Sequence, residues 1–421
     1  MNAIILVVLF VASDVNPPAF YAPNEELRTY LLEAGEKSPT LEVRHSEWRA
    51  SLQRIPQVTA LDDPMFTFGY FLQSEMNDYK VMLSQKFPWF GTLRTRGEKA
   101  TLDADATLAR FYNERNLVFS EVKKAYFEYG FLGDSIKVTE SQIEVLEYME
   151  DIVRSKFETG MAKEDELLRI SIEKTKVKDR RDGFMQFKPA LMSRLNETLG
   201  AEAAVDRPWP QKAKFPHELP SQDEIHAQIR IENPDIKRLD YLIESRGKQI
   251  KLAKKKGHPD FTLGLEYLDL DAANNPDDNA MFSFKVNLPI WRKKIKSSIS
   301  EAKIRETSAT FAKRRRTLEL EEAAQMAIFT IEDAKRRYAL FENTLTPQAQ
   351  RSYESLQSQY ATGDVGTSFI DVLDSIQTLL AFELEQIRAA RDWQVGAANL
   401  EFLMGGPWGN PEGREDAPGK S

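Results

Sequence analysis

Two stretches of alternating residues restrict the fold of this 421-residue chain more than any other feature. In the later stretch, residues 259–291, apolar side chains alternate with mostly polar ones over 261–268 and again over 282–288. A period of two predicts a pair of strands with one apolar face. Residues 269–279 between them are rich in Asp, Asn and Pro, which predicts an exposed turn.

The same strand pair occurs earlier, over residues 64–89. Its opening, Pro-Met-Phe-Thr-Phe-Gly from Pro64, resembles Pro-Asp-Phe-Thr-Leu-Gly from Pro259, and both pairs close on a proline flanked by large apolar residues. Other landmarks recur in the same order about 200 residues apart. They are the similar motifs that begin at Pro39 and Pro234, the turns at Gly160 and Gly363, and the helix ends at Gly200 and Gly405. The chain is therefore predicted to be an internal tandem repeat.

Very long helices are predicted after each strand pair. Residues 92–158 contain almost no helix breaker, and a helix of about 65 residues would be roughly 100 Å long. A return helix is predicted over 163–199. In the second repeat the predicted helices cover about 223–256, about 292–361, and the stretch from there to Met404.

These landmarks predict five segments: a signal or extended segment (1–24), a first repeat (25–200), a Pro-rich linker (201–222), a second repeat (223–405) and a disordered tail (406–421). The apolar run 3–12 has the length of a signal-peptide core and is too short to span a bilayer as a helix. No basic residue precedes it, so a buried N-terminal segment is the alternative.

The composition argues against several classes of function. A net charge of −8 and a pI near 5.4 argue against a general nucleic-acid binder. The absence of cysteine excludes disulfides and thiolate metal sites, and no lipid anchor on a cysteine is expected. The four histidines have no metal-ligand spacing, and no phosphate loop or nucleophile elbow is present. Neither an enzyme nor a cofactor is predicted.

The strands have the properties of membrane strands. Each has about nine alternating residues, enough for a tilted strand to cross a bilayer. Phe87, Trp89, Phe90 and Trp291 gather at the strand ends, as an interfacial girdle requires. Four strands cannot close a barrel, which needs about eight, and open edges cannot face lipid. Strands in a membrane would therefore require several chains to share one barrel; the alternative is a soluble hairpin pair packed on helices.

From about Pro39 to Gly405 the sequence resembles the TolC-like outer-membrane efflux proteins. The residues that carry the resemblance are 233–236, 258–264, 288–291, Tyr360 with Gly363, 368–374 and 400–405. It implies a mainly α fold with membrane β structure: a homotrimer whose shared twelve-stranded outer-membrane barrel continues into a long helical barrel in the periplasm. It also implies an exit duct that is served by a periplasmic adaptor protein and an inner-membrane pump. The alternative is a soluble periplasmic coiled-coil scaffold or adaptor.

The resemblance also suggests roles for single residues. Asp371 and Asp374 would ring a periplasmic constriction, although acidic residues also favour a helix N-terminus for its own sake. The turns with Phe157 and Gly160, and with Tyr360 and Gly363, would be adaptor-docking tips; alternatively the glycines only end helices. Trp89 and Trp291 would form the girdle against outer-membrane lipid. No arginine near the second turn is placed to pair with an acidic residue such as Glu166.

Overall fold

A computed structural model describes residues 24–72, 77–211, 215, 219–270, 279–363 and 366–408. The expectations for the signal segment, for the tip of the turn at 271–278 and for the tail from 409 onward lie outside these residues. The chain forms two compact units. The sheet unit comprises Glu42–Asn113 and Pro234–Leu318, and the helical unit comprises Met1–Leu41, Glu114–Asn233 and Glu319–Ser421.

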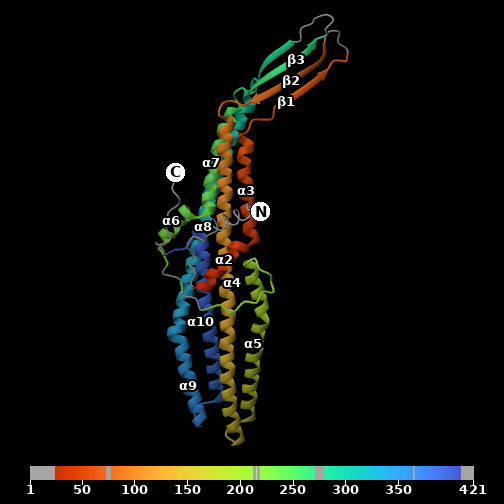
Figure 1. Cartoon of the computed structure of the whole chain (residues 1–421). Coiled ribbons are helices and arrows are strands. Elements are labelled where there is room, and N and C mark those ends of the chain that lie inside the picture. Colours follow the sequence, from red (N-terminus) through yellow and green to blue (C-terminus); the bar gives the residue numbers. More distant parts are fainter. Residues whose placement is uncertain are drawn as a thin grey trace. The chain divides into compact units, whose positions relative to one another are not determined.

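The sheet unit contains one antiparallel sheet of four strands in the order β1-β2-β3-β4 (Figure 1). The strands are β1 (Met65–Tyr70), β2 (Asn77–Phe87), β3 (Phe261–Leu270) and β4 (Asn279–Val286). The two predicted strand pairs join through β2 and β3, with Leu83 opposite Leu265 and Phe87 opposite Phe261. Both pairs are thus confirmed, and they form a single surface.

The helices of the sheet unit are α3 (Pro39–Thr59), α7 (Pro234–Lys255), residues 92–113 of α4 (Thr92–Glu158) and residues 292–318 of α8 (Arg292–Leu340). Small residues allow these helices to approach closely, since Ala104 and Ala109 of α4 and Ala302 of α8 are buried. Polar contacts add to this packing. The Ser245 hydroxyl donates to Asp103 over 2.5 Å, and Lys248 donates to Glu98 over 2.8 Å.

The helical unit contains the other helices: α2 (Glu25–Lys37), α5 (Glu164–Thr198), α6 (Gln222–Glu232), α9 (Thr346–Thr362), α10 (Phe369–Met404) and the remainders of α4 and α8. One core cluster joins α4, α5, α9 and α10, which lie side by side in Figure 1, and includes Leu146, Met149, Tyr353 and Leu379. A second cluster joins α2, α4 and α5 around Tyr126 and Tyr129. Among the described residues, every helix is too short or too polar to span a bilayer.

Two predicted helices are interrupted, so those expectations were wrong in detail. The helix expected over 223–256 is divided into α6 and α7 at Asn233, which is extended (φ −61°, ψ 122°) because a following proline disfavours the helical conformation. The helix expected over 292–361 contains a π-helical segment, Phe341–Leu345, just before Pro347. Since proline has no N–H to donate, one backbone hydrogen bond of the ladder is missing at this point.

The two repeats close in the same way, and this symmetry supports the predicted duplication. Gly200 and Gly405 end α5 and α10 with left-handed φ angles of 69° and 85°. A Cβ on Gly200 would lie 2.5 Å from the Lys37 carbonyl oxygen, and one on Gly405 would lie 2.8 Å from the Asn233 Cα. Each return helix therefore ends against the helix break that precedes a proline, Pro39 in one repeat and Pro234 in the other.

Candidate functional site

The strand register places most of the large apolar side chains on one side of the sheet, because directly paired residues share a face. This apolar sheet face consists of Phe66, Phe68, Tyr70, Tyr79, Val81, Leu83, Phe87, Phe261, Leu263, Leu265, Tyr267, Phe282, Phe284 and Val286. Phe68, Leu265 and Phe282 are 61%, 60% and 68% exposed. An apolar surface that covers four strands requires a second apolar phase to cover it.

The opposite side, the polar sheet face, carries Lys80, Lys86, Lys285, Glu266, Ser84 and Ser283, together with Leu268 and the methionines Met65, Met82 and Met281. Gly264 lies between the two serines, and a Cβ there would be 2.6 Å from the Ser283 hydroxyl oxygen. The sheet thus has one face that is apolar and one face that water can solvate. A wall between lipid and an aqueous lumen has this construction.

The two predicted girdle tryptophans lie in different surroundings. The Trp89 ring stacks on His258 with centroids 4.7 Å apart, and its backbone N–H donates to the Asp260 carboxylate over 3.1 Å. Trp291 is 73% exposed, and the neighbouring Phe90 is similarly open to solvent. Trp89 therefore holds the connection between β2 and α4 in place. Trp291, by contrast, is exposed to the surroundings of the chain.

The two predicted tips are turns between helices. Gly160 and Gly363 adopt left-handed φ angles of 77° and 83°, and both face open space. Phe157 of the first tip is 42% exposed, whereas Tyr360 of the second is only 7% exposed. Three of the four tip residues are thus accessible, and Tyr360 has a packing role instead.

Tyr360 ties the second tip to the first. Its hydroxyl donates to the Glu166 carboxylate over 2.5 Å, and its backbone oxygen accepts from Lys156, whose ammonium lies 4.3 Å from the centre of the ring. Burial, with a further contribution from Glu166, raises the pKa of the Tyr360 hydroxyl, which therefore remains a donor at neutral pH. The partner of Glu166 is a tyrosine rather than an arginine. Sequence reasoning missed Lys156, which carries no motif.

Asp371 and Asp374 lie at the start of α10, and both are exposed. The Asp371 carboxylate accepts from the Ser368 backbone N–H over 3.0 Å, and the Ser368 hydroxyl accepts from the Asp371 N–H over 3.3 Å. This reciprocal pair is a capping box, so Asp371 helps to start the helix. Asp374 makes no side-chain hydrogen bond or ion pair within the described part of the chain. The two carboxylates therefore differ in their freedom to act on an ion.

A buried ion pair in the helical unit escaped prediction. Lys123 of α4 pairs with Glu401 of α10, and their side chains are 4% and 7% exposed. Burial raises the pKa of Glu401, and the positive charge of Lys123 opposes that shift. Nearby, the Ser120 hydroxyl donates to the Ala398 carbonyl over 3.0 Å. The signal available in the sequence was the single charge of Glu401 in an otherwise apolar stretch, whereas Lys123 lies among other charged residues.

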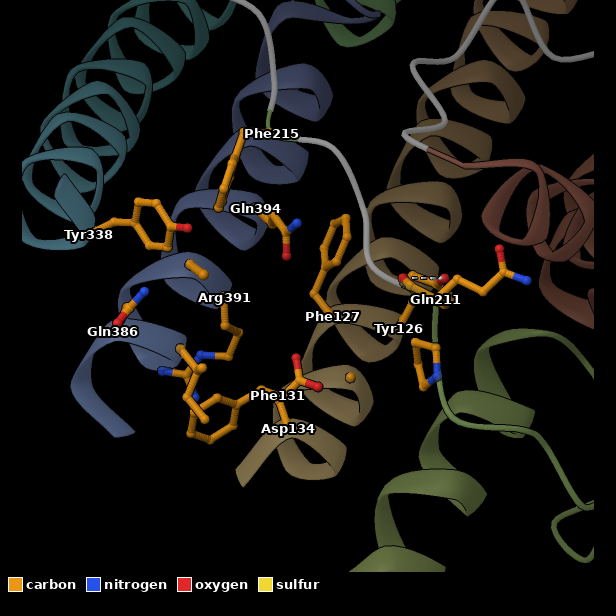
Figure 2. Close-up of a pocket in the computed structure, with 14 residues that line it drawn as sticks. Tyr126, Phe127, Phe131, Asp134, Gln211, Phe215, Tyr338, Gln386, Arg391 and Gln394 are labelled. Carbon is orange, nitrogen blue, oxygen red and sulfur yellow. Dashed lines mark hydrogen bonds between the residues drawn. The ribbon is translucent and has the colours of Figure 1, made fainter. Parts of the chain in front are cut away.

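A pocket of about 230 Å³ opens between α4, α8, α10 and the linker (Figure 2). Figure 2 shows Tyr338 on one side and Phe127 and Tyr126 on the other. The linker reaches α4 because Gly130 and Gly133 leave room for it; a Cβ on Gly133 would lie 2.8 Å from the Trp209 ring. None of the residues predicted to have a function lines this pocket. No group of three or more His, Asp or Glu side chains within the described ranges could hold a metal ion.

Comparisons with known proteins agree with this geometry. Residues 226–406 match the model of the outer membrane efflux protein family. The chain is 23% identical over 407 residues to the probable outer membrane lipoprotein SilC of Salmonella typhimurium, a match that covers 91% of this chain and 84% of SilC. The structure of CusC superposes with a TM-score of 0.77 at 16% identity, over 92% of this chain and 93% of CusC. The structure of VceC of Vibrio cholerae superposes with a TM-score of 0.75 at 15% sequence identity, over 91% of this chain and 97% of VceC.

Fold and sheet together define the class as an outer-membrane channel with a helical periplasmic part. The chain carries an outer membrane efflux protein domain in residues 226–406, and its fold is that of the outer-membrane efflux channels, the exit ducts of tripartite efflux pumps. Members of this class are channels and not enzymes. The recognition made from the sequence is confirmed, and so are the fold class, the cellular location and the general function.

Proposed function

We propose that three copies of this chain form one duct through the outer membrane, with the apolar sheet face toward lipid and the polar sheet face toward an aqueous lumen. The observation that carries this proposal is the exposed apolar face on a sheet whose edges, β1 and β4, are open. Unpaired strand edges are excluded from lipid, so β1 of one copy must pair with β4 of the next. Three copies then close a barrel of twelve strands, within the known size range.

The duct is passive. Passage through it requires no covalent chemistry from the chain, and the energy for export comes from an inner-membrane pump that reaches the duct through a periplasmic adaptor. The tips are the surface offered to the adaptor. Phe157 and the left-handed Gly160 and Gly363 are exposed there, and Tyr360 positions them through its hydrogen bond to Glu166.

Asp374 supplies the periplasmic constriction in this proposal. Three symmetry-related Asp374 carboxylates would attract cations at the narrow end, whereas Asp371 is held by its capping box with Ser368. In a planar bilayer, Asp374→Ala should weaken block by divalent cations more than Asp371→Ala does. Equal block by the wild type and the Asp374→Ala variant would remove Asp374 from the constriction.

Cell fractionation tests the duct against its alternative, a soluble periplasmic scaffold. The duct requires the mature protein in the outer-membrane fraction, resistant to washing at high salt, and running as a trimer on gels until it is heated. Recovery as a monomer in the soluble fraction would contradict it. The variant Gly133→Trp, which obstructs the approach of the linker to α4, serves as a control for misfolded protein in the membrane pellet.

A further inference from the structure

Two runs of cations meet where the sheet passes into the helices. One lies at the end of α7 and the other at the start of α8, and neither contains an acidic residue. We call the eight residues the basic junction: Lys251, Lys254, Lys255, Lys256, Arg292, Lys293, Lys294 and Lys296. Their density is unexpected in a chain with 57 basic and 65 acidic residues. Cations at the N-terminus of α8 also oppose the helix dipole, so they need a reason other than helix stability.

The two runs are neighbours in space. A Cβ on Gly257, just after α7, would lie 3.4 Å from a methyl carbon of Ile295 in the first turn of α8. Successive helical residues are rotated by about 100°, so the cations on either side of Ile295 cover most of the remaining circumference of that turn. The first turn of α8 therefore presents positive charge on every side except the one that Ile295 occupies.

Most of these charges have no partner within the chain. Lys255 donates to the backbone oxygen of Phe90 over 2.8 Å. The side chains of the other seven are exposed and make no hydrogen bond or ion pair with any residue that the structure describes. Several other cations of the sheet unit are paired, as in Lys248 with Glu98 and Lys313 with Asp240. Seven exposed, unpaired charges in one place form a surface for an anionic partner.

The position of the basic junction identifies that partner. Exposed apolar residues, Phe90, Leu288, Ile290 and Trp291, connect it to the end of the apolar sheet face. Along the chain the order is apolar strand, aromatic residues and then cations. A bilayer presents the same order of hydrocarbon, interface and phosphate.

We propose that the basic junction binds the phosphate groups of anionic phospholipids in the membrane leaflet on the helical side of the sheet. This inference rests on the proposed function, because it requires the apolar sheet face to lie in lipid. The first repeat does not duplicate the surface, since Arg94 at the start of α4 is already paired with Glu98 over 3.0 Å. Each chain therefore contributes one such surface, and a trimer has three.

Lipid selection by the full-length protein in vesicles tests the proposal. Fluorescence of Trp89 and Trp291, at the junction, is quenched by brominated lipid, and the quenching gives the binding constant of phosphatidylglycerol relative to phosphatidylcholine. For the wild type we expect a ratio of at least about threefold, which decreases at high salt as the Debye length shortens. In the variant Lys254→Gln/Lys256→Gln/Arg292→Gln/Lys293→Gln the ratio should approach one.

A matched control removes the same charge elsewhere. Arg180→Gln/Lys303→Gln/Arg314→Gln/Arg351→Gln neutralises four exposed cations outside the junction and should retain the wild-type ratio. An unchanged ratio in the junction variant would overturn the proposal. So would a junction variant that keeps its lipid preference but loses anion selectivity in conductance, because its cations would then face the lumen.

Failure of the duct itself would be seen separately. Wild-type protein should stay in pure phosphatidylcholine vesicles after a wash at high salt, because this step depends on the apolar sheet face and not on charge. Release by that wash would contradict the membrane position of the sheet, and with it both proposals. Retention together with no preference for phosphatidylglycerol would contradict the lipid-binding surface alone.

Discussion

The helical unit and the sheet unit use the same kinds of apolar residue in opposite ways. In the helical unit, Phe119, Tyr126 and Leu146 are almost fully buried by their own chain. In the sheet, Phe68, Leu265 and Phe282 are more than half exposed, although the strands that carry them pair with their neighbours in regular register. Burying an apolar side chain contributes about 1.5–3 kcal/mol, so the sheet leaves a large gain unrealised in a single chain.

This difference indicates what covers each surface. The helical core is completed within the chain, and its stability can be measured on a protein kept out of lipid. The apolar sheet face lacks such a cover within the chain, and in the proposed duct a membrane and neighbouring copies complete it. Substitutions should therefore have effects that depend on the unit: on folding in the helical unit, and on membrane insertion in the sheet unit.

The largest expected effect concerns charge in the helical core. Lys123→Met leaves the buried Glu401 carboxylate unpaired and should lower the free energy of unfolding by about 3–5 kcal/mol. The double variant Lys123→Met/Glu401→Leu should recover most of this loss, since it buries no charge. Urea unfolding followed by circular dichroism checks both. Equal destabilisation of the single and double variants would show that the pair is not the cause.

The stability of the Lys123→Met variant should depend on pH. The folded-state pKa of Glu401 lies above its ordinary value of 4.5, and loss of Lys123 raises it further. A folded state that holds its proton more tightly loses stability as pH rises from the unfolded pKa through the folded one. Lys123→Met should therefore recover stability on acidification from about pH 7 toward pH 5. A stability of this variant that stays flat or falls over that range would contradict the assignment.

Next in size is a matched pair of truncations. Leu146→Ala opens a cavity in a core where Leu146 is 0% exposed, and should cost about 2–5 kcal/mol of unfolding free energy. Leu265→Ala makes the same chemical change on the apolar sheet face and should cost no more than about 1 kcal/mol in detergent. Denaturant midpoints in one detergent give both numbers. Equal costs would remove the distinction between the two units.

Adjacent residues on opposite faces of β4 give the third prediction. Phe282→Arg places a charge on the apolar sheet face and should reduce the free energy of insertion into vesicles by about 2–4 kcal/mol if the site lies near mid-bilayer. Ser283→Arg, one residue along and on the polar sheet face, should insert nearly as well as the wild type. Equal loss in both variants would mean that the strand does not separate lipid from water.

The smallest effect concerns two tyrosine hydroxyls. Tyr360→Phe removes the hydrogen bond to Glu166 that joins the tips, and should cost about 1 kcal/mol. Tyr79→Phe, on the apolar sheet face, removes a hydroxyl that has no hydrogen-bond partner among the described residues and should be neutral. Thermal unfolding of the two variants compares them. A neutral Tyr360→Phe would indicate that the packing of the ring alone holds the tips.

The sequence predicted what depends on periodicity. Alternation identified both strand pairs, and the lack of breakers identified α4 within a residue at either end. The break at Asn233 was missed although Pro234 was part of the recognised motif, because a single proline competes with strong helical periodicity on both sides. Partners far apart in sequence were also missed. Lys123 and Glu401 are 278 residues apart, and a charged residue in the sequence does not reveal which residue will neutralise it.

The site residues were predicted less completely than the fold. Spacing placed Asp371 and Asp374 together at a helix start, but only the hydrogen bonds to Ser368 show that one of them is a cap. Tyr360 was assigned to an exposed tip, yet its ring is buried, because a tyrosine near a turn can point either way. Conformation decides such cases, and the sequence pattern does not.

In the proposed duct, one face of the sheet meets lipid and the other meets water. Since the chain has no cysteine, single variants along β4 can each be labelled at one known position in intact outer membranes. A membrane-impermeant maleimide should react with Ser283→Cys and Lys285→Cys and not with Phe282→Cys or Phe284→Cys, while all four react fully after denaturation. Equal reaction at all four positions in the folded protein would contradict the account.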